Sequence, residues 1–201
     1  MDSVQKHIKR SISRSKKGEL IFPTDYRGMG SEASIKMALS RLAKEGKLQR
    51  LAHGIYFVPK MDPLFGELYP GPQEVAESLA RKEKVRIRPA GAYALHRLGL
   101  TTQVPTRLVY ITDGASRNLK VGNATIRFKA TTPKKLSTKG KISGLLIQAL
   151  EELDIEHIDA ETENKIRELL RKEEPAHLKY DLTLAPAKIH DYLLQLMKES
   201  Q

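Results

Sequence analysis

The sequence contains neither cysteine nor tryptophan. The absence of cysteine excludes disulfides and cysteine-ligated metal sites, and it is typical of proteins that work in a reducing cytosol. Long apolar runs are missing too: no stretch approaches the roughly 18 residues of a membrane span, and the first residues lack the apolar core of a signal peptide. We therefore expect a soluble, cytoplasmic protein without membrane contact.

The usual sequence signatures of catalysis are also missing. The chain has no P-loop, no dinucleotide-binding glycine fingerprint, no HExxH or other zinc-binding spacing and no nucleophile-elbow serine. His96 has no second His, Asp or Ser beside it at a spacing that favours catalysis, so packing or exposure explains it better. The sequence therefore predicts no enzyme activity, no catalytic residue, no cofactor and no metal.

Positive charge is what the sequence has in excess. Its 201 residues include 35 Lys and Arg against 24 Asp and Glu, a net charge of +11. Residues 1–60 carry 13 basic and 5 acidic residues and residues 61–150 carry 15 and 6, whereas residues 151–201 carry 7 and 13. This asymmetry favours a polyanionic partner, above all nucleic acid, over charge that only keeps the chain soluble.

The length fits one large domain or two small ones. The segment KMDPLFGELYPGP, residues 60–72, contains three prolines and two glycines, a composition typical of a connection. We therefore predict an N-terminal domain at residues 1–60, a linker at 61–72 and a second domain at 73–201.

Residues 22–59 have the order of elements that is typical of a winged helix-turn-helix. A very short helix is predicted at 23–26, and a glycine-rich turn leads from it to a longer helix over 31–45. A β-hairpin over 47–58 follows, and in this fold the hairpin is the wing. Such a module inserts one helix into the major groove of DNA.

The helix over 31–45 has an apolar stripe, made of Ile35, Ala38, Leu39 and Leu42, which we expect to face the core. The other side is small, polar and basic, so it suits close approach to base edges and contact with phosphates. A solvated helix surface has similar side chains, and a simple turn position explains His53 as well. With the flanking turn and wing, the expected DNA-binding residues are Arg27, Ser31, Ala33, Lys36, Met37, Ser40, Arg41, Lys44, Lys47, Arg50 and His53.

The segment GSEASIKMALSRLAKEGKLQRLAHGIYFVP, residues 30–59, resembles the N-terminal winged helix of the AbiE-type antitoxins of type IV toxin–antitoxin, or abortive infection, operons. The shared features are a glycine-rich turn, a helix of the form xxALSRLxKxGKL and a strand that closes on Gly-Ile-Tyr. The resemblance implies an autorepressor that binds inverted repeats in its own operator, with antitoxin activity in the C-terminal domain. It also implies a nucleotidyltransferase-like toxin encoded by the adjacent gene, countered functionally rather than in a stable complex.

Residues 73–201 are predicted to form a mixed α/β domain with a small antiparallel sheet and C-terminal helices, so the fold class of the chain is α+β. A strand is predicted at 107–112, and a hairpin turns at Gly122-Asn123 into a strand at 124–129 whose apolar and basic residues alternate. One face of this sheet should be buried and the other basic. Six residues are candidates for a second polyanion surface, with a solvated face as an equal alternative: Arg117, Lys120, Arg127, Lys129, Lys134 and Lys135.

Two other functions stay open at this point. The basic middle segment could bind RNA in a translation-associated protein. The acidic last third could bind a toxin as an interaction module, although a solvated acidic face explains its carboxylates better.

Overall fold

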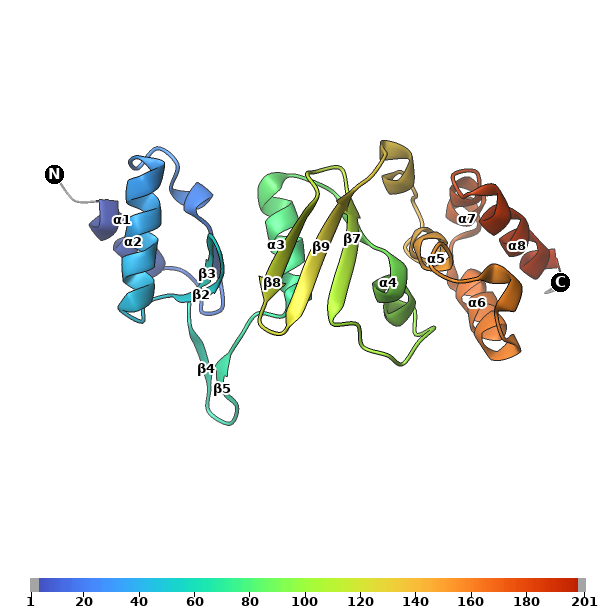
Figure 1. Ribbon diagram of the computed structural model, residues 1–201, viewed down its shortest axis with the longest axis horizontal. Helices are drawn as coiled ribbons and strands as arrows, with labels where there is room; N and C mark the ends of the chain where they lie inside the picture. Colours follow the sequence, from blue (N-terminus) through green and yellow to red (C-terminus); the bar gives the residue numbers. More distant parts are fainter. Residues whose placement is uncertain (1–3, 199–201) are drawn as a thin grey trace. The chain divides into compact units, whose positions relative to one another are not determined.

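The structure is a computed structural model that describes residues 4–198 (Figure 1). It confirms the α+β class, and the chain divides into two compact units. Unit 1 runs to Leu79 and includes Lys120–Gly122, and unit 2 comprises Ala80–Leu119 and the chain from Asn123 onwards. Among the described residues, no helix has the length and apolar character needed to cross a membrane.

Unit 1 combines helices with two small antiparallel sheets. In one sheet β3 lies between β1 and β2, and in the other β4 pairs with β5. The elements are α1 (Val4–Ile12), β1 (Leu20–Ile21), η1 (Pro23–Tyr26), α2 (Glu32–Lys44), β2 (Gln49–Ala52), β3 (Ile55–Phe57), β4 (Lys60–Asp62) and β5 (Gly66–Leu68).

The core of unit 1 forms because α1 and α2 each bury one apolar stripe. Ile8 and Ile12 of α1 are buried together with Leu39 and Leu42 of α2, and Tyr56 of β3 joins the same cluster. Each such side chain stabilises the fold by roughly 1.5–3 kcal/mol relative to exposure. The stripe expected on the 31–45 helix is confirmed, so the opposite side of α2 faces away from this core.

The segment expected to be a linker, residues 61–72, contains most of the β4–β5 hairpin. The carboxylate of Asp62 accepts the backbone N–H groups of Leu64 and Phe65 at 2.9 and 3.0 Å, which closes the turn and lowers the pKa of Asp62. Just past β5, the ring of Tyr69 lies 5.3 Å from the buried ring of Phe57. These contacts extend unit 1 beyond residue 60.

Helix α3 (Pro72–Glu83) crosses the boundary between the two units. Unit 2 continues with a four-stranded sheet and a group of helices at its C-terminal end (Figure 1). The further elements are β6 (Ile87–Pro89), α4 (Gly91–Arg97), β7 (Arg107–Thr112), β8 (Arg117–Val121), β9 (Ala124–Ala130), η2 (Pro133–Leu136), α5 (Ser143–Leu150), η3 (Ile155–His157), α6 (Ala160–Lys172), α7 (Pro175–Leu182) and α8 (Ala187–Lys198).

The sheet of unit 2 is mixed rather than antiparallel throughout. Its order is β6-β7-β9-β8; β6 runs antiparallel to β7, but β9 runs parallel to it, with Val109 opposite Arg127. The short connection over 113–116 leads from β7 to β8 at the edge of the sheet, and the position between these two strands is filled by β9. The β8–β9 hairpin then returns beside β7 in the same direction, which corrects the expectation of a purely antiparallel sheet.

Helices α5 to α8 share a core that the sequence predicted only in part. Leu146 and Leu150 of α5 are buried against residues of α6, α7 and α8, such as Ile166, Leu178 and Leu193. The sequence predicts C-terminal helices in this region, but α7 has few apolar positions and its local pattern does not indicate a helix. Proline at its first position is compatible with a helix start, and packing against α5 supplies the stabilisation that so short a helix lacks alone.

The loop before α5 is held by two carboxylates from other helices. Asp181 of α7, fully buried, accepts the N–H groups of Lys139 and Gly140 at 2.7 and 2.9 Å and the hydroxyl of Ser143 at 2.6 Å. Glu173, just after α6, accepts the N–H groups of Ile142 and Ser143 at 2.7 and 2.8 Å. The bonds to Glu173 satisfy N–H groups at the start of α5 that no earlier turn of helix can pair, and those to Asp181 satisfy N–H groups of the preceding loop.

Two further details position this loop. Partial burial acts to raise the pKa of Glu173, but hydrogen bonds from the N–H groups of Ser143, Ile142 and Glu174 outweigh it and lower the pKa, so the carboxylate is ionised at neutral pH.

Gly144 lets α5 approach β6, because a Cβ there would collide with the Arg88 guanidinium and the Thr138 hydroxyl. The loop therefore fixes both the start and the placement of α5 within unit 2.

We predict that Asp181→Asn destabilises the protein by about 1–3 kcal/mol, because the new amide NH₂ would face N–H donors that then lose their acceptor. The measurement is the free energy of unfolding in urea, followed by far-UV circular dichroism. Asp191→Asn, at an exposed position on α8, is the matched control and should change that free energy by less than about 0.5 kcal/mol. Equal stability of the two variants would contradict the role given to Asp181.

Candidate nucleic-acid interface

Helix α2 begins at the N-cap that the sequence indicates. Ser31 has an extended backbone, and its Oγ accepts a hydrogen bond from the N–H of Ser34 at 3.2 Å, which satisfies one unpaired donor of the first turn. Gly28, in the preceding turn, has a φ of +88°, a conformation that glycine adopts readily. The Ser31 hydroxyl thus serves the helix itself, and its contact with DNA stays a prediction.

The other end of α2 is closed by a Schellman motif. Gly46 has a φ of +70°, its N–H donates to the carbonyl of Ala43 at 3.1 Å, and the N–H of Lys47 donates to the carbonyl of Leu42 at 2.9 Å. This pattern pairs carbonyls that the helix leaves open and turns the chain sharply. It positions Lys47 directly beyond the helix, and the buried side chain of Leu48 anchors the start of β2.

The face of α2 opposite its apolar stripe is exposed. Ala33, Lys36, Met37, Arg41 and Lys44 are exposed, while Ser40, the sixth expected position, is partly buried. Met37 is notable because 53% of this large apolar side chain is accessible. A thymine methyl group is an apolar contact available in the major groove, so this face offers both apolar and basic contacts.

Near the start of α2, the positive charge is partly compensated. The ammonium of Lys36 lies 2.5 Å from the carboxylate of Glu32, one turn earlier. The pKa of Glu32 is lowered by its hydrogen bond to Lys36 and by the positive charge of Lys36, with a smaller effect of the Arg27 charge, so the Glu32 carboxylate stays ionised. Lys36 is therefore less available to a phosphate than its exposure alone suggests.

Near the end of α2, less of the charge is compensated. Arg41 makes a long hydrogen bond of 3.5 Å to Gln5 of α1, whose amide donates to Glu45 at 3.0 Å. The side chains of Lys44 and Lys47 have no hydrogen bond or ion pair with any residue in 4–198. The available positive charge therefore lies at the C-terminal end of α2 and at the start of the hairpin.

The hairpin that follows carries two of the expected residues at its turn. Arg50 donates to the carbonyl of Ala52 at 3.4 Å, and its second nitrogen lies 3.2 Å from Nδ1 of His53. Both side chains stay exposed, whereas Tyr56 is buried in the core and does not face solvent. Arg50 is thus oriented by the turn, and His53 contributes to that arrangement.

Three of the six residues expected to form a second polyanion surface, Arg127, Lys129 and Lys135, line one hollow. Arg117 makes a two-pronged contact with Glu83, at 2.8 and 2.6 Å, and its guanidinium lies over the ring of Phe128. Lys135 is paired with Glu151 at 2.5 Å. Lys120 and Lys134 are exposed and do not line this hollow, whereas Arg107, which the sequence pattern does not indicate, does.

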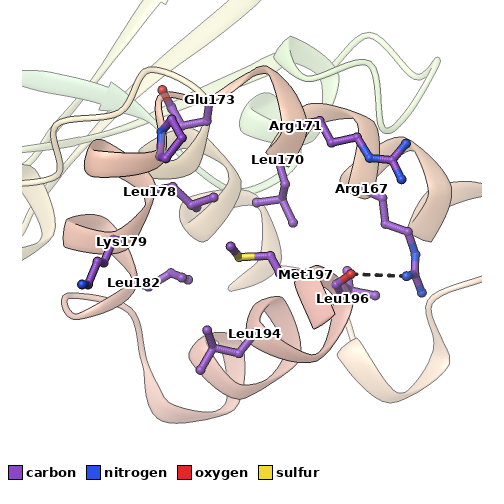
Figure 2. A pocket seen from close by; sticks show the side chains of 11 residues that line it. Arg167, Leu170, Arg171, Glu173, Leu178, Lys179, Leu182, Leu194, Leu196 and Met197 are labelled. Atoms are coloured by element: carbon purple, nitrogen blue, oxygen red, sulfur yellow. Dashed lines mark hydrogen bonds between the residues drawn. The ribbon is translucent and has the colours of Figure 1, made fainter. Parts of the chain in front are cut away.

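A second hollow in unit 2, of about 500 Å³, is an apolar groove between α6, α7 and α8 (Figure 2). Leucine side chains and Met197 line its floor, and Figure 2 shows Arg167, Arg171 and Lys179 around its rim. The guanidinium of Arg167 is engaged with the carbonyl of Leu196 at 3.3 Å and with Glu163. The sequence pattern did not indicate this groove, because each helix taken alone shows only an ordinary apolar stripe.

The residues in 4–198 include no group of three or more His, Asp or Glu side chains arranged to hold a metal ion. In comparisons with known proteins, DUF6088, a family of unknown function, matches residues 7–178. The match covers most of both units and ends within α7. No curated protein shows significant similarity to the chain.

Proposed function

The chain belongs to the DUF6088 family, whose function is unknown, and we propose that it is a DNA-binding transcriptional repressor that reads the major groove with α2. The observation that carries the proposal is the exposed, basic face of α2, with Arg41, Lys44 and Lys47 at its C-terminal end. Such side chains supply the phosphate and base-edge contacts on which DNA recognition depends.

The topology of unit 1 supports a winged helix-turn-helix. Helix α1, strand β1, the short helix η1, helix α2 and the β2–β3 hairpin follow in that order, and β1 pairs with β3 in a sheet of order β1-β3-β2. In this interpretation η1 and α2 form the helix-turn-helix, and the turn between β2 and β3 is the tip of the wing. Arg50 and His53, at that turn, would then contact the DNA backbone or minor groove.

The proposal extends to operon control and antitoxin activity through the resemblance of residues 30–59 to AbiE-type antitoxins. In that role the protein would bind inverted repeats in its own promoter, and C-terminal residues would counter a nucleotidyltransferase-like toxin encoded by the adjacent gene. The support for this extension is the resemblance alone, so operator binding and antitoxin activity need separate tests.

We predict that the double variant Arg41→Gln/Lys44→Gln loses operator binding while its fold is retained, because both side chains are exposed. Each lost contact should weaken binding by about 1–3 kcal/mol, and the slope of log K against log salt should fall by about 2. The measurement is a mobility-shift titration with the promoter duplex of the protein's own gene at about 150 mM salt, where non-specific contacts are weakened.

The control for this experiment is Lys172→Gln/Lys198→Gln, which removes the same charge from exposed positions on α6 and α8. It should bind the promoter duplex as tightly as the wild type. If Arg41→Gln/Lys44→Gln also bound that duplex with wild-type affinity, α2 would not be the reading helix. Equal wild-type binding to the promoter, to bulk DNA and to structured RNA would favour the RNA-binding alternative.

The antitoxin role makes a prediction of its own. Co-expression of the chain should restore growth to cells that express the adjacent gene, and Arg41→Gln/Lys44→Gln should restore it equally, because the antitoxin activity is assigned to the C-terminal domain. Colony counts under separately inducible promoters provide the measurement. Failure of the wild-type chain to restore growth would remove the antitoxin role and leave the repressor proposal standing.

A second candidate function, a protein-interaction module, is favoured by the apolar groove between α6, α7 and α8. The exposed Arg171 and Lys179 at its rim have no ion pair within residues 4–198, in a third of the chain that is otherwise acidic. An amphipathic helix of a partner protein, apolar on one side and acidic along its edges, is complementary to this groove.

We predict that Met197→Glu abolishes co-purification of the adjacent gene product, because a carboxylate would enter the apolar floor of the groove. Lys198→Glu, at the neighbouring position outside this groove, is the control and should leave co-purification unchanged. The readout is an affinity pull-down from cells that co-express both proteins. A wild-type chain that carries down no partner in this experiment would rule out the second candidate.

A further inference from the structure

Unit 2 contains a polar hollow that the DNA-binding proposal does not use. It measures about 540 Å³ and is formed by β7 and β9 on one side and the end of α5 on the other, with η2 closing part of the rim. Pockets that bind small molecules typically measure about 300–1,000 Å³. The hollow therefore has the size of a small-molecule site.

One wall of the hollow is cationic. Arg107 of β7 and Arg127 and Lys129 of β9 lie on the same face of the sheet, because Arg107 is opposite Thr125 and side chains alternate along each strand. The Cα atoms of residues two positions apart on one strand, such as Arg127 and Lys129, are separated by roughly 7 Å. None of the three side chains has a hydrogen bond or ion pair with another residue in 4–198, so all three are available to a ligand.

The floor between these cations is apolar. Val109 lies opposite Arg127 and Ile111 opposite Lys129, on the same face of the sheet. Ile111 packs with Leu136 and Ala90, with Val109 partly buried beside them. A flat or apolar part of a ligand can therefore lie on these side chains while its charged part reaches the cations.

The wall supplied by α5 carries hydrogen-bond acceptors instead. Glu151 is held by Lys135 at 2.5 Å and by the amide of Gln148 at 3.4 Å. Glu152 lies beside Gly91, and its carboxylate has no partner among the described residues. This wall can therefore accept hydrogen bonds from donor groups of a ligand, opposite the cationic wall.

We propose that this hollow binds a mononucleotide. Its phosphate would lie on Arg107, Arg127 and Lys129, its base on Val109 and Ile111, and an amino group of the base would donate to Glu152. A phosphate monoester carries about 1.5 to 2 negative charges and three acceptor oxygens, so it matches three separate cations better than a carboxylate does. The site lies wholly in unit 2 and does not depend on the proposed function of α2.

The test uses the full chain and AMP as the probe, with binding measured by isothermal titration calorimetry at about 50 mM salt. Wild-type protein should bind AMP, and adenosine, which lacks the phosphate, should bind at least about 10-fold more weakly. Arg127→Gln/Lys129→Gln should weaken AMP binding at least about 10-fold, with an unchanged circular dichroism spectrum, because both side chains are exposed. Glu152→Gln should reduce the preference for AMP over purine riboside 5′-monophosphate, which lacks the amino group.

The control is Lys120→Gln/Lys134→Gln, which removes the same charge from exposed positions outside the hollow and should bind AMP like the wild type. Four results would overturn the proposal, and the first three concern AMP. In these, the wild type fails to bind AMP at millimolar concentration, Arg127→Gln/Lys129→Gln binds AMP as tightly as the wild type, or the control variant loses as much AMP affinity as Arg127→Gln/Lys129→Gln. The fourth result is that inorganic phosphate binds as tightly as AMP, because the base would then contribute nothing to the affinity. Operator binding is measured separately, so either proposal can fail alone.

Discussion

The carboxylates of Asp181 and Glu173 bind the loop over 139–143, and the arrangement of unit 2 depends on that interaction. Acidic side chains from α7 and from the end of α6 take up backbone donors ahead of α5. Helix α5 then packs on both of its sides: Ala149 against Ala94 and Leu95 of α4, and Leu146 and Leu150 against α6 to α8. Its last turn also forms the acceptor wall of the polar hollow. Removing these carboxylates would cost stability, because the buried N–H groups that donate to them would be left without an acceptor.

Ion pairing separates the basic residues that are available to a ligand from those that are not. Lys36, Arg117 and Lys135 are each paired with a carboxylate, although their sequence context resembles that of Lys44, Lys47 and Lys129. Exposed ion pairs add little stability, so their main effect here is on the local field. Basic side chains without a carboxylate partner include those at the C-terminal end of α2 in unit 1 and on the β7–β9 face in unit 2. The net charge of +11 alone therefore does not say which basic residues a ligand can reach.

The elements with strong local patterns could be predicted from the sequence. The bounds predicted for α2 lie within one residue of the observed ones, because Ser31 and Gly46 mark its ends and an apolar stripe marks its buried side. The β8–β9 hairpin followed from its Gly122-Asn123 turn. Weaker patterns misled: the β4–β5 hairpin lies in a segment rich in proline and glycine, and α7 has few apolar positions. Both the β4–β5 hairpin and α7 are stabilised by contacts with residues elsewhere in the chain, such as that of Tyr69 with Phe57, because their local sequence does not favour one structure strongly.

Local periodicity and composition are enough to predict the α+β class, the buried side of α2 and the basic excess. The tertiary structure decided that β7 and β9 are parallel and that Arg107 joins Arg127 and Lys129. It also decided that Asp181 and Glu173 act inside the fold, not on a solvated acidic face. These features join residues separated by about 20 to 40 positions. Their pairing depends on how whole elements pack, and no short stretch of sequence specifies it.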